Sequence, residues 1–65
     1  MSDKARTQAT RAVLKHFNTL VDDQYGTLKF HTKTINKTQM KVLSRLDVEN
    51  VDLKRSDTGI TVIMN

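Results

Sequence analysis

The first third of this chain repeats its apolar residues at the spacing of an amphipathic helix. We expect this helix to run from Asp3 or Lys4 to Gln24, with Gly26 placed to end it. Because its first turns would bury only alanines, we expect residues 1–4 to fray. The stripe that would face a core comprises Ala5, Ala9, Ala12, Val13, His16, Phe17 and Leu20.

The apolar period changes to two between residues 27 and 32, which predicts a β-strand. Leu28 and Phe30 alternate with polar residues there, and threonine and phenylalanine favour an extended backbone.

A second helix has the clearest start signal in the chain. Asn36 can cap it, and Gln39 stands three residues later, where its side chain can reach back to complete a capping box. We expect the helix to end near Leu46 or Asp47. Its apolar side would be formed by Met40, Val42, Leu43 and Leu46.

The C-terminal residues predict a β-hairpin, with strands at 51–55 and 60–64 and a four-residue loop at 56–59. Gly59 suits a left-handed position at the end of such a loop. This register gathers the apolar side chains on one face and leaves Ile63 on the polar face. The expected pairs are Arg55 with Ile60, Leu53 with Val62, and Val51 with Met64.

The element order is therefore helix, strand, helix, hairpin, which predicts a small α+β fold in a single domain spanning residues 1–65. This order resembles small winged-helix domains, in which a short first strand pairs with a C-terminal hairpin and a basic helix precedes the wing. Sixty-five residues without cysteine can bury only a thin core and have no disulfide to support it. A homodimer that completes the core is an open alternative.

Charge adds a functional indication, because the net charge is +4 and is unevenly distributed. No acidic residue occurs between Gln24 and Leu46, where a base stands at every fourth position: Lys29, Lys33, Lys37, Lys41 and Arg45. The last three fall within the predicted second helix, opposite its apolar side. Like charges four residues apart repel, and a bound anion would relieve that repulsion. The alternative interpretation is an ordinary solvated helix face.

Candidate nucleic-acid contacts follow from this positive stripe and its surroundings. Lys54 and Arg55, near the hairpin tip, could reach phosphates or instead protect a strand edge from aggregation. A second positive patch could be formed by bases of the first helix, Lys4, Arg6, Arg11 and Lys15, of which Lys4, Arg11 and Lys15 share its wet side. The alternative is a solubilising face. The full candidate set is Lys37, Lys41, Arg45, Thr38, Ser44, Lys33, Lys54 and Arg55.

Several functional classes find no support in the sequence. We expect no enzyme, because there is no cysteine nucleophile, glycine-rich phosphate loop or recognisable catalytic set. Two histidines without cysteine define no metal site, and no cofactor motif is present. No apolar run has spanning length and no signal peptide is recognisable, so we expect an intracellular, cytoplasmic protein that does not enter a membrane.

The sequence thus favours a small DNA-binding protein, a regulator of transcription or an accessory factor. DNA is preferred to RNA because no RNA-specific aromatic motif occurs. The alternative is an interaction module of the kind found in phages and mobile elements, which binds a host protein through the C-terminal strand residues Val62, Ile63 and Met64. An acidic protein that mimics nucleic acid is a third candidate partner.

Overall fold

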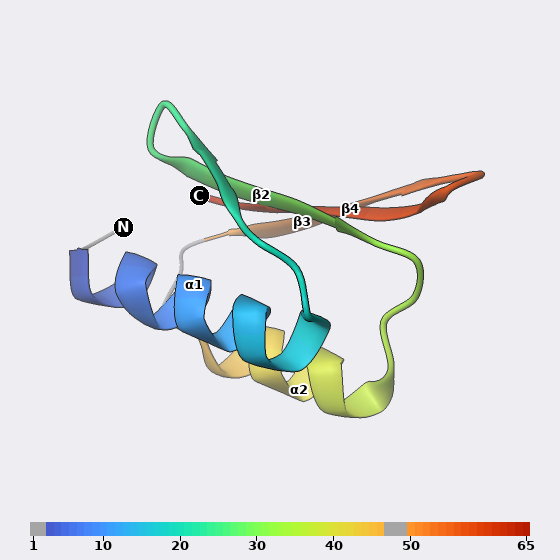
Figure 1. Ribbon diagram of the computed structural model, residues 1–65, viewed down its shortest axis with the longest axis horizontal. Coiled ribbons are helices and arrows are strands. Elements are labelled where there is room, and N and C mark those ends of the chain that lie inside the picture. The colour runs from blue at the N-terminus through green and yellow to red at the C-terminus, as the bar shows by residue number, and fades with distance from the viewer. Residues whose placement is uncertain (1–2, 47–49) are drawn as a thin grey trace.

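Two helices cover one face of a four-stranded antiparallel sheet in the computed structural model, which describes residues 3–46 and 50–65 (Figure 1). The chain is a small α+β fold, as the sequence predicted. The strand order in the sheet is β1-β2-β4-β3. Along the chain the elements are α1 (Asp3–Phe17), β1 (Asp22–Gln24), β2 (Thr27–Thr32), α2 (Lys37–Arg45), β3 (Val51–Ser56) and β4 (Gly59–Met64).

The first helix is shorter than predicted, and an unpredicted strand follows it. Asn18 has a φ of 52°, a left-handed conformation that asparagine tolerates and that ends a helix. The predicted helical continuation to Gln24 is therefore wrong, and Leu20 is 78% exposed. Gly26 does adopt a left-handed conformation, but beside Tyr25 it forms the turn of the β1–β2 hairpin, where both central residues need positive φ. Fraying was expected for residues 1–4, and residues 1 and 2 lie outside the part of the chain that the structure describes.

The C-terminal hairpin has the predicted register. Arg55 pairs with Ile60, Leu53 with Val62, and Val51 with Met64. Ser56 and Gly59 also pair, so the connection is a two-residue turn and not the predicted four-residue loop. Strand β2 matches its predicted bounds, and it pairs with β4.

The core lies between α1 and the inner face of the sheet. The rings of Phe17 and Phe30 meet with centroids 4.9 Å apart and planes tilted by 58°. His16 was expected on the apolar side of the helix, but it is exposed, and the buried residues of α1 are Ala5, Ala9, Val13 and Phe17. The buried cluster comprises Ala9, Val13, Phe17, Leu28, Phe30, Leu43, Ile60, Val62 and Met64.

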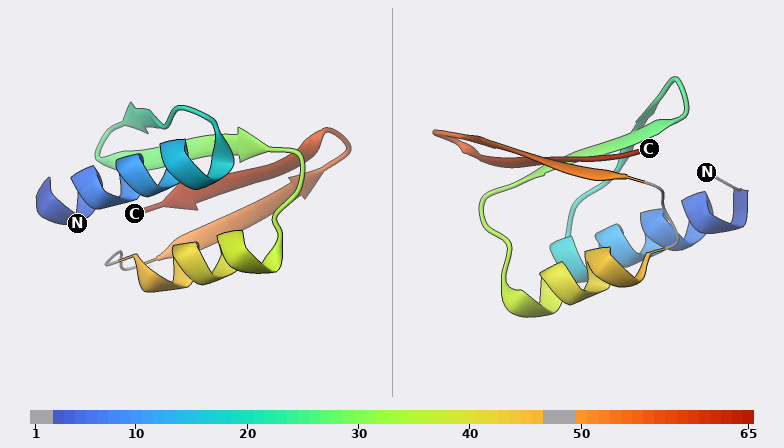
Figure 2. Two further views of the ribbon diagram at one scale, coloured as in Figure 1. Left: turned by 60° about the horizontal axis from the view of Figure 1, so that its bottom comes forward. Right: turned by 180° about the vertical axis from the view of Figure 1, so that it is seen from behind.

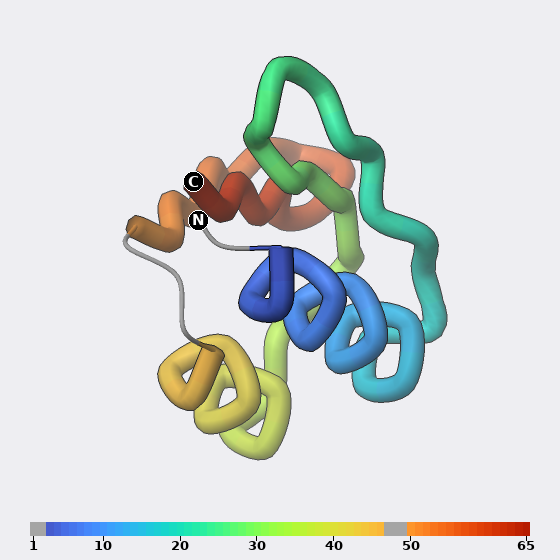
Figure 3. The backbone as a smooth tube through the Cα atoms, turned by 90° about the vertical axis from the view of Figure 1, so that its left-hand side faces the viewer, coloured from blue at the N-terminus to red at the C-terminus, as the bar shows by residue number. Residues whose placement is uncertain are grey.

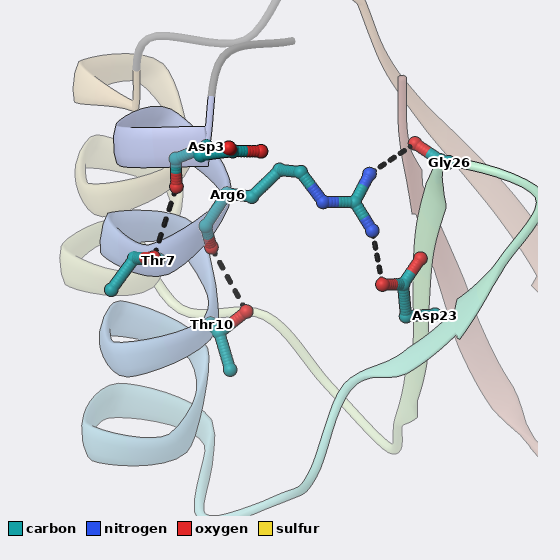
Figure 4. Close-up of polar contacts among 6 residues, drawn as sticks. All are labelled: Asp3, Arg6, Thr7, Thr10, Asp23 and Gly26. Atoms are coloured by element: carbon teal, nitrogen blue, oxygen red, sulfur yellow. Dashed lines mark hydrogen bonds and ion pairs between the residues drawn. The ribbon is translucent and has the colours of Figure 1, made fainter.

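A side-chain clamp joins the N-terminal half of α1 to the β1–β2 hairpin. The guanidinium of Arg6 donates from Nη1 to the carbonyl oxygen of Gly26 at 2.7 Å, and its Nη2 pairs with the carboxylate of Asp23 (Figure 4). This half of α1 buries only Ala5 and Ala9, which have little apolar surface. Arg6 therefore supplies a polar link where packing is weakest.

The second helix lies beside the first and runs in the opposite direction (Figure 2). Gln39 donates from Nε2 to the carbonyl oxygen of His16 at 2.9 Å, which joins the start of α2 to the end of α1. Leu43 is buried, whereas Met40, predicted to belong to the apolar side, is 42% exposed. The side of α2 that faces away from α1 and the sheet is therefore open to solvent (Figure 3).

Candidate nucleic-acid interface

The start of α2 fixes which of its side chains point outward. Asn36 is the N-cap, and its Oδ1 accepts a hydrogen bond from the backbone N–H of Gln39 at 2.8 Å. The Oε1 of Gln39 accepts in return from the backbone N–H of Asn36 at 2.9 Å. This capping box confirms the predicted start and makes Lys37 the first helical residue. The predicted end at Asp47 lies outside the described residues, and the helix extends to Arg45 with Leu46 as its C-cap.

The basic stripe, defined as Lys37, Lys41 and Arg45, lies on the solvent side of α2. Because residues advance by about 100° around a helix, the three side chains fall within roughly one quarter of its circumference. All three are exposed, while Leu43 is buried on the other side. Within residues 3–46 and 50–65, no carboxylate forms an ion pair with any of them. The stripe therefore presents its positive charge to solvent.

Two hydroxyl residues accompany the stripe. Thr38 and Ser44 are both exposed on α2. The Oγ of Ser44 donates to the carbonyl oxygen of Met40 at 3.0 Å, so its lone pairs remain able to accept. Both side chains can therefore add neutral hydrogen bonds beside the cations.

A groove of about 740 Å³ separates the start of α2 from the β3–β4 hairpin. Lys33 and Arg55, both predicted contacts, line it together with the apolar side chains of Met40 and Leu53. Lys54 does not belong to this group. Strand residues alternate between faces, so Lys54 points to the sheet face that the helices leave uncovered in the described part of the chain.

The basic row of α1, defined as Lys4, Arg11 and Lys15, is exposed on the side away from the buried Ala9 and Val13. The sequence alone did not indicate where this row lies relative to the second helix. In the structure the two helices form one layer (Figure 3), and the row and the stripe each lie on the side of their own helix that faces away from its buried residues.

Of the three residues expected to form an interface, Val62, Ile63 and Met64, the structure leaves only Ile63 partly exposed. Val62 and Met64 have no exposed surface, because they belong to the core. Strand β4 also lies between β2 and β3, so neither of its edges is free to extend another sheet. Ile63 is half-buried on the uncovered sheet face, between Lys29 and Asp52 of the neighbouring strands.

Comparison with known proteins gave no match to a family model, a curated protein or a solved structure. In the described part of the chain, neither helix has the length and apolar character needed to cross a bilayer. The functional argument therefore rests on the geometry and charge of the helical layer.

Proposed function

We propose that this chain binds nucleic acid, duplex DNA in preference to RNA, through α2, and acts as a regulator of transcription or an accessory factor. The observation that carries the proposal is the exposed basic stripe, which no carboxylate of the described residues neutralises. Cations concentrated on one face attract the phosphate backbone and supply most of the sequence-independent affinity for DNA.

The diameter of α2 is compatible with a major-groove partner. An α-helix with its side chains is about 10–12 Å across, and the major groove of B-DNA is about 12 Å wide. In this arrangement Lys37 and Lys41 contact phosphates, while Arg45 has the planar donor geometry to read a guanine edge.

The energetics of the isolated helix also support an anionic partner. Lys37 with Lys41, and Lys41 with Arg45, are like-charge pairs four residues apart, each of which costs about 0.3 kcal/mol. Lys37 also stands in the first turn, where no acidic residue offsets it and the helix dipole opposes a cation. Bound phosphates remove both penalties.

The finer part of the proposal is docking in the manner of a winged helix, with α2 in a groove and the β3–β4 hairpin beside it. Lys33 and Arg55 lie on the α2 side of that hairpin, where they can reach a flanking phosphate. Lys54, on the uncovered face, contributes less.

Equilibrium titrations of duplex DNA, single-stranded DNA and RNA at several salt concentrations test this proposal. Three neutralised phosphates predict a slope of log affinity against log salt of about −3 on duplex DNA. Affinity should then fall roughly 60-fold between about 50 and 200 mM salt. Absence of binding to all three nucleic acids, or binding that ignores salt, would overturn it, and tighter binding to RNA would refute the preference for DNA.

A further inference from the structure

The sheet has two outer edges, and they differ in length. Strand β1 forms one edge with three residues, and the Arg6 clamp covers its hairpin. Strand β3 forms the other edge with six residues, none of them proline. Within residues 3–46 and 50–65, no strand pairs with the outer side of β3. A long, unpaired edge is a template for another strand.

The direction of the free backbone groups on β3 follows from one hydrogen bond. The N–H of Asn65 donates to the carbonyl oxygen of Asn50 at 3.0 Å, so the backbone groups of residue 50 point toward β4. Backbone groups alternate in direction along a strand. The backbone groups of Val51, Leu53 and Arg55 therefore point outward from the sheet.

We propose that a second copy of this chain pairs with β3 in antiparallel orientation, about a two-fold axis at Leu53. In this register Leu53 lies opposite the partner's Leu53 and exchanges backbone hydrogen bonds with it. Asp52 then lies opposite the partner's Lys54, and Lys54 opposite the partner's Asp52. These positions are non-hydrogen-bonded pairs, in which the facing side chains approach most closely.

Charge complementarity selects this register over its neighbours. An axis at Asp52 would place that carboxylate opposite its own copy, and an axis at Lys54 would do the same with two cations. A two-fold axis that passes between two neighbouring residues would pair a residue of the helical face of the sheet with a residue of the uncovered face. Two opposite-charge pairs and an apolar centre thus occur together only when the axis passes through Leu53.

The packing beneath β3 also favours a second copy. Val51 and Leu53 are only half-buried, although they point toward the helical side of the sheet. The groove beside them contains the exposed Met40 and the half-buried Ile35. A domain of this size has a thin core. Pairing through β3 brings the grooves of the two copies close together and covers apolar surface that is in contact with water in a single copy.

The paired sheets would form one continuous sheet of eight strands with both α2 helices on the same side. The pairing does not depend on the proposed DNA binding, because it rests on the strand edge alone. Where both hold, the two basic stripes are related by two-fold symmetry, which matches a palindromic DNA site.

Light scattering on the full chain without nucleic acid, over a range of concentrations, tests the pairing. The wild type should reach twice its monomer mass of 7.4 kDa. Asp52→Lys and Lys54→Asp each place like charges opposite each other in two pairs, so each should weaken the dimer roughly 10- to 100-fold. Asp52→Lys combined with Lys54→Asp in one chain restores both attractions and should restore the dimer. A mixture of the two single variants should form a heterodimer for the same reason.

Asp22→Lys is the matched control, since it makes the same charge change on β1, opposite Lys29 and at the opposite edge of the sheet. It should leave the dimer intact, and circular dichroism verifies that every variant is folded. A wild type that stays monomeric at every concentration, a double variant that does not recover, or an equal loss in Asp22→Lys would overturn the proposal. None of these results depends on whether the protein binds DNA.

Discussion

Gly59 occupies a position where neither the backbone conformation nor the space admits a side chain. Its φ is +138°, and a Cβ there would collide with the carbonyl oxygen of Thr32 and lie 2.9 Å from the Cα of Lys33. Both obstacles are backbone atoms, so relief requires the hairpin to move away from β2. We expect Gly59→Ala to cost roughly 2 kcal/mol of stability and to lower the melting temperature by roughly 10 °C, measured by thermal denaturation.

Gly26→Ala is the control for that substitution. Gly26 also has positive φ, at +81°, but the nearest atom to an added Cβ would be Nη1 of Arg6 at 3.9 Å, an ordinary contact. The strain of a left-handed alanine alone costs roughly 1 kcal/mol. Equal losses for the two substitutions would show that the close approach of the hairpin to β2 is unimportant.

Arg6 gives a prediction about pH. The hydrogen bond that its guanidinium donates to Asp23 raises the pKa of Arg6 above its ordinary value. A raised pKa in the folded state means that the stabilisation is complete below the unfolded value and is lost only as pH rises through the folded value. The melting temperature of Arg6→Gln should therefore be lower than that of the wild type by the same amount at about pH 6 and about pH 9. A difference that shrinks between these two conditions would contradict this role.

At the scale of elements, the sequence correctly predicted the start of α2 and the register of the β3–β4 hairpin, because both depend on residues close together in the chain. The cap of α2 depends on two side chains three residues apart, and the hairpin register depends on alternation within one short segment. The end of α1 was different. Its apolar spacing continues past Phe17 to Leu20, but Asn18 turns the chain so that residues 22–24 can pair with β2. This pairing adds β1 to the edge of the sheet, and its stabilisation overrides the helical periodicity.

The cap of α2 can be tested directly. Asn36→Ala removes the acceptor for the N–H of Gln39 and should cost about 1 kcal/mol, measured by denaturant unfolding. Asn36→Asp keeps an acceptor at the same place and should remain within a few tenths of a kcal/mol of the wild type. A loss of the same size in both variants would mean that the side-chain acceptor does not stabilise the helix start.

At the scale of the whole molecule, the candidate site was predictable only in part. The stripe on α2 follows from helical spacing, so its exposure could be inferred. The position of α1 beside α2, and the bond from Gln39 to His16, depend on how two distant segments pack. Strand alternation alone predicts that Lys54 and Arg55 point to opposite faces of the sheet. Which of these two faces packs against α2 depends on the tertiary structure.

The central claim is that α2 provides the nucleic-acid contact, and a comparison of two charge-matched variants tests it most directly. One carries Lys37→Gln, Lys41→Gln and Arg45→Gln, and the other carries Lys4→Gln, Arg11→Gln and Lys15→Gln. Each loses two lysines and one arginine from an exposed helix face, so net charge falls equally. Duplex-DNA affinity is measured for both, with circular dichroism to verify folding.

We predict that the α2 variant loses roughly 100-fold in affinity and that its salt slope flattens by about 3. The α1 variant should lose less than roughly 10-fold, because its row supports binding without providing the main contact. Equal losses in the two variants, or an α2 variant that binds as the wild type does, would contradict the account.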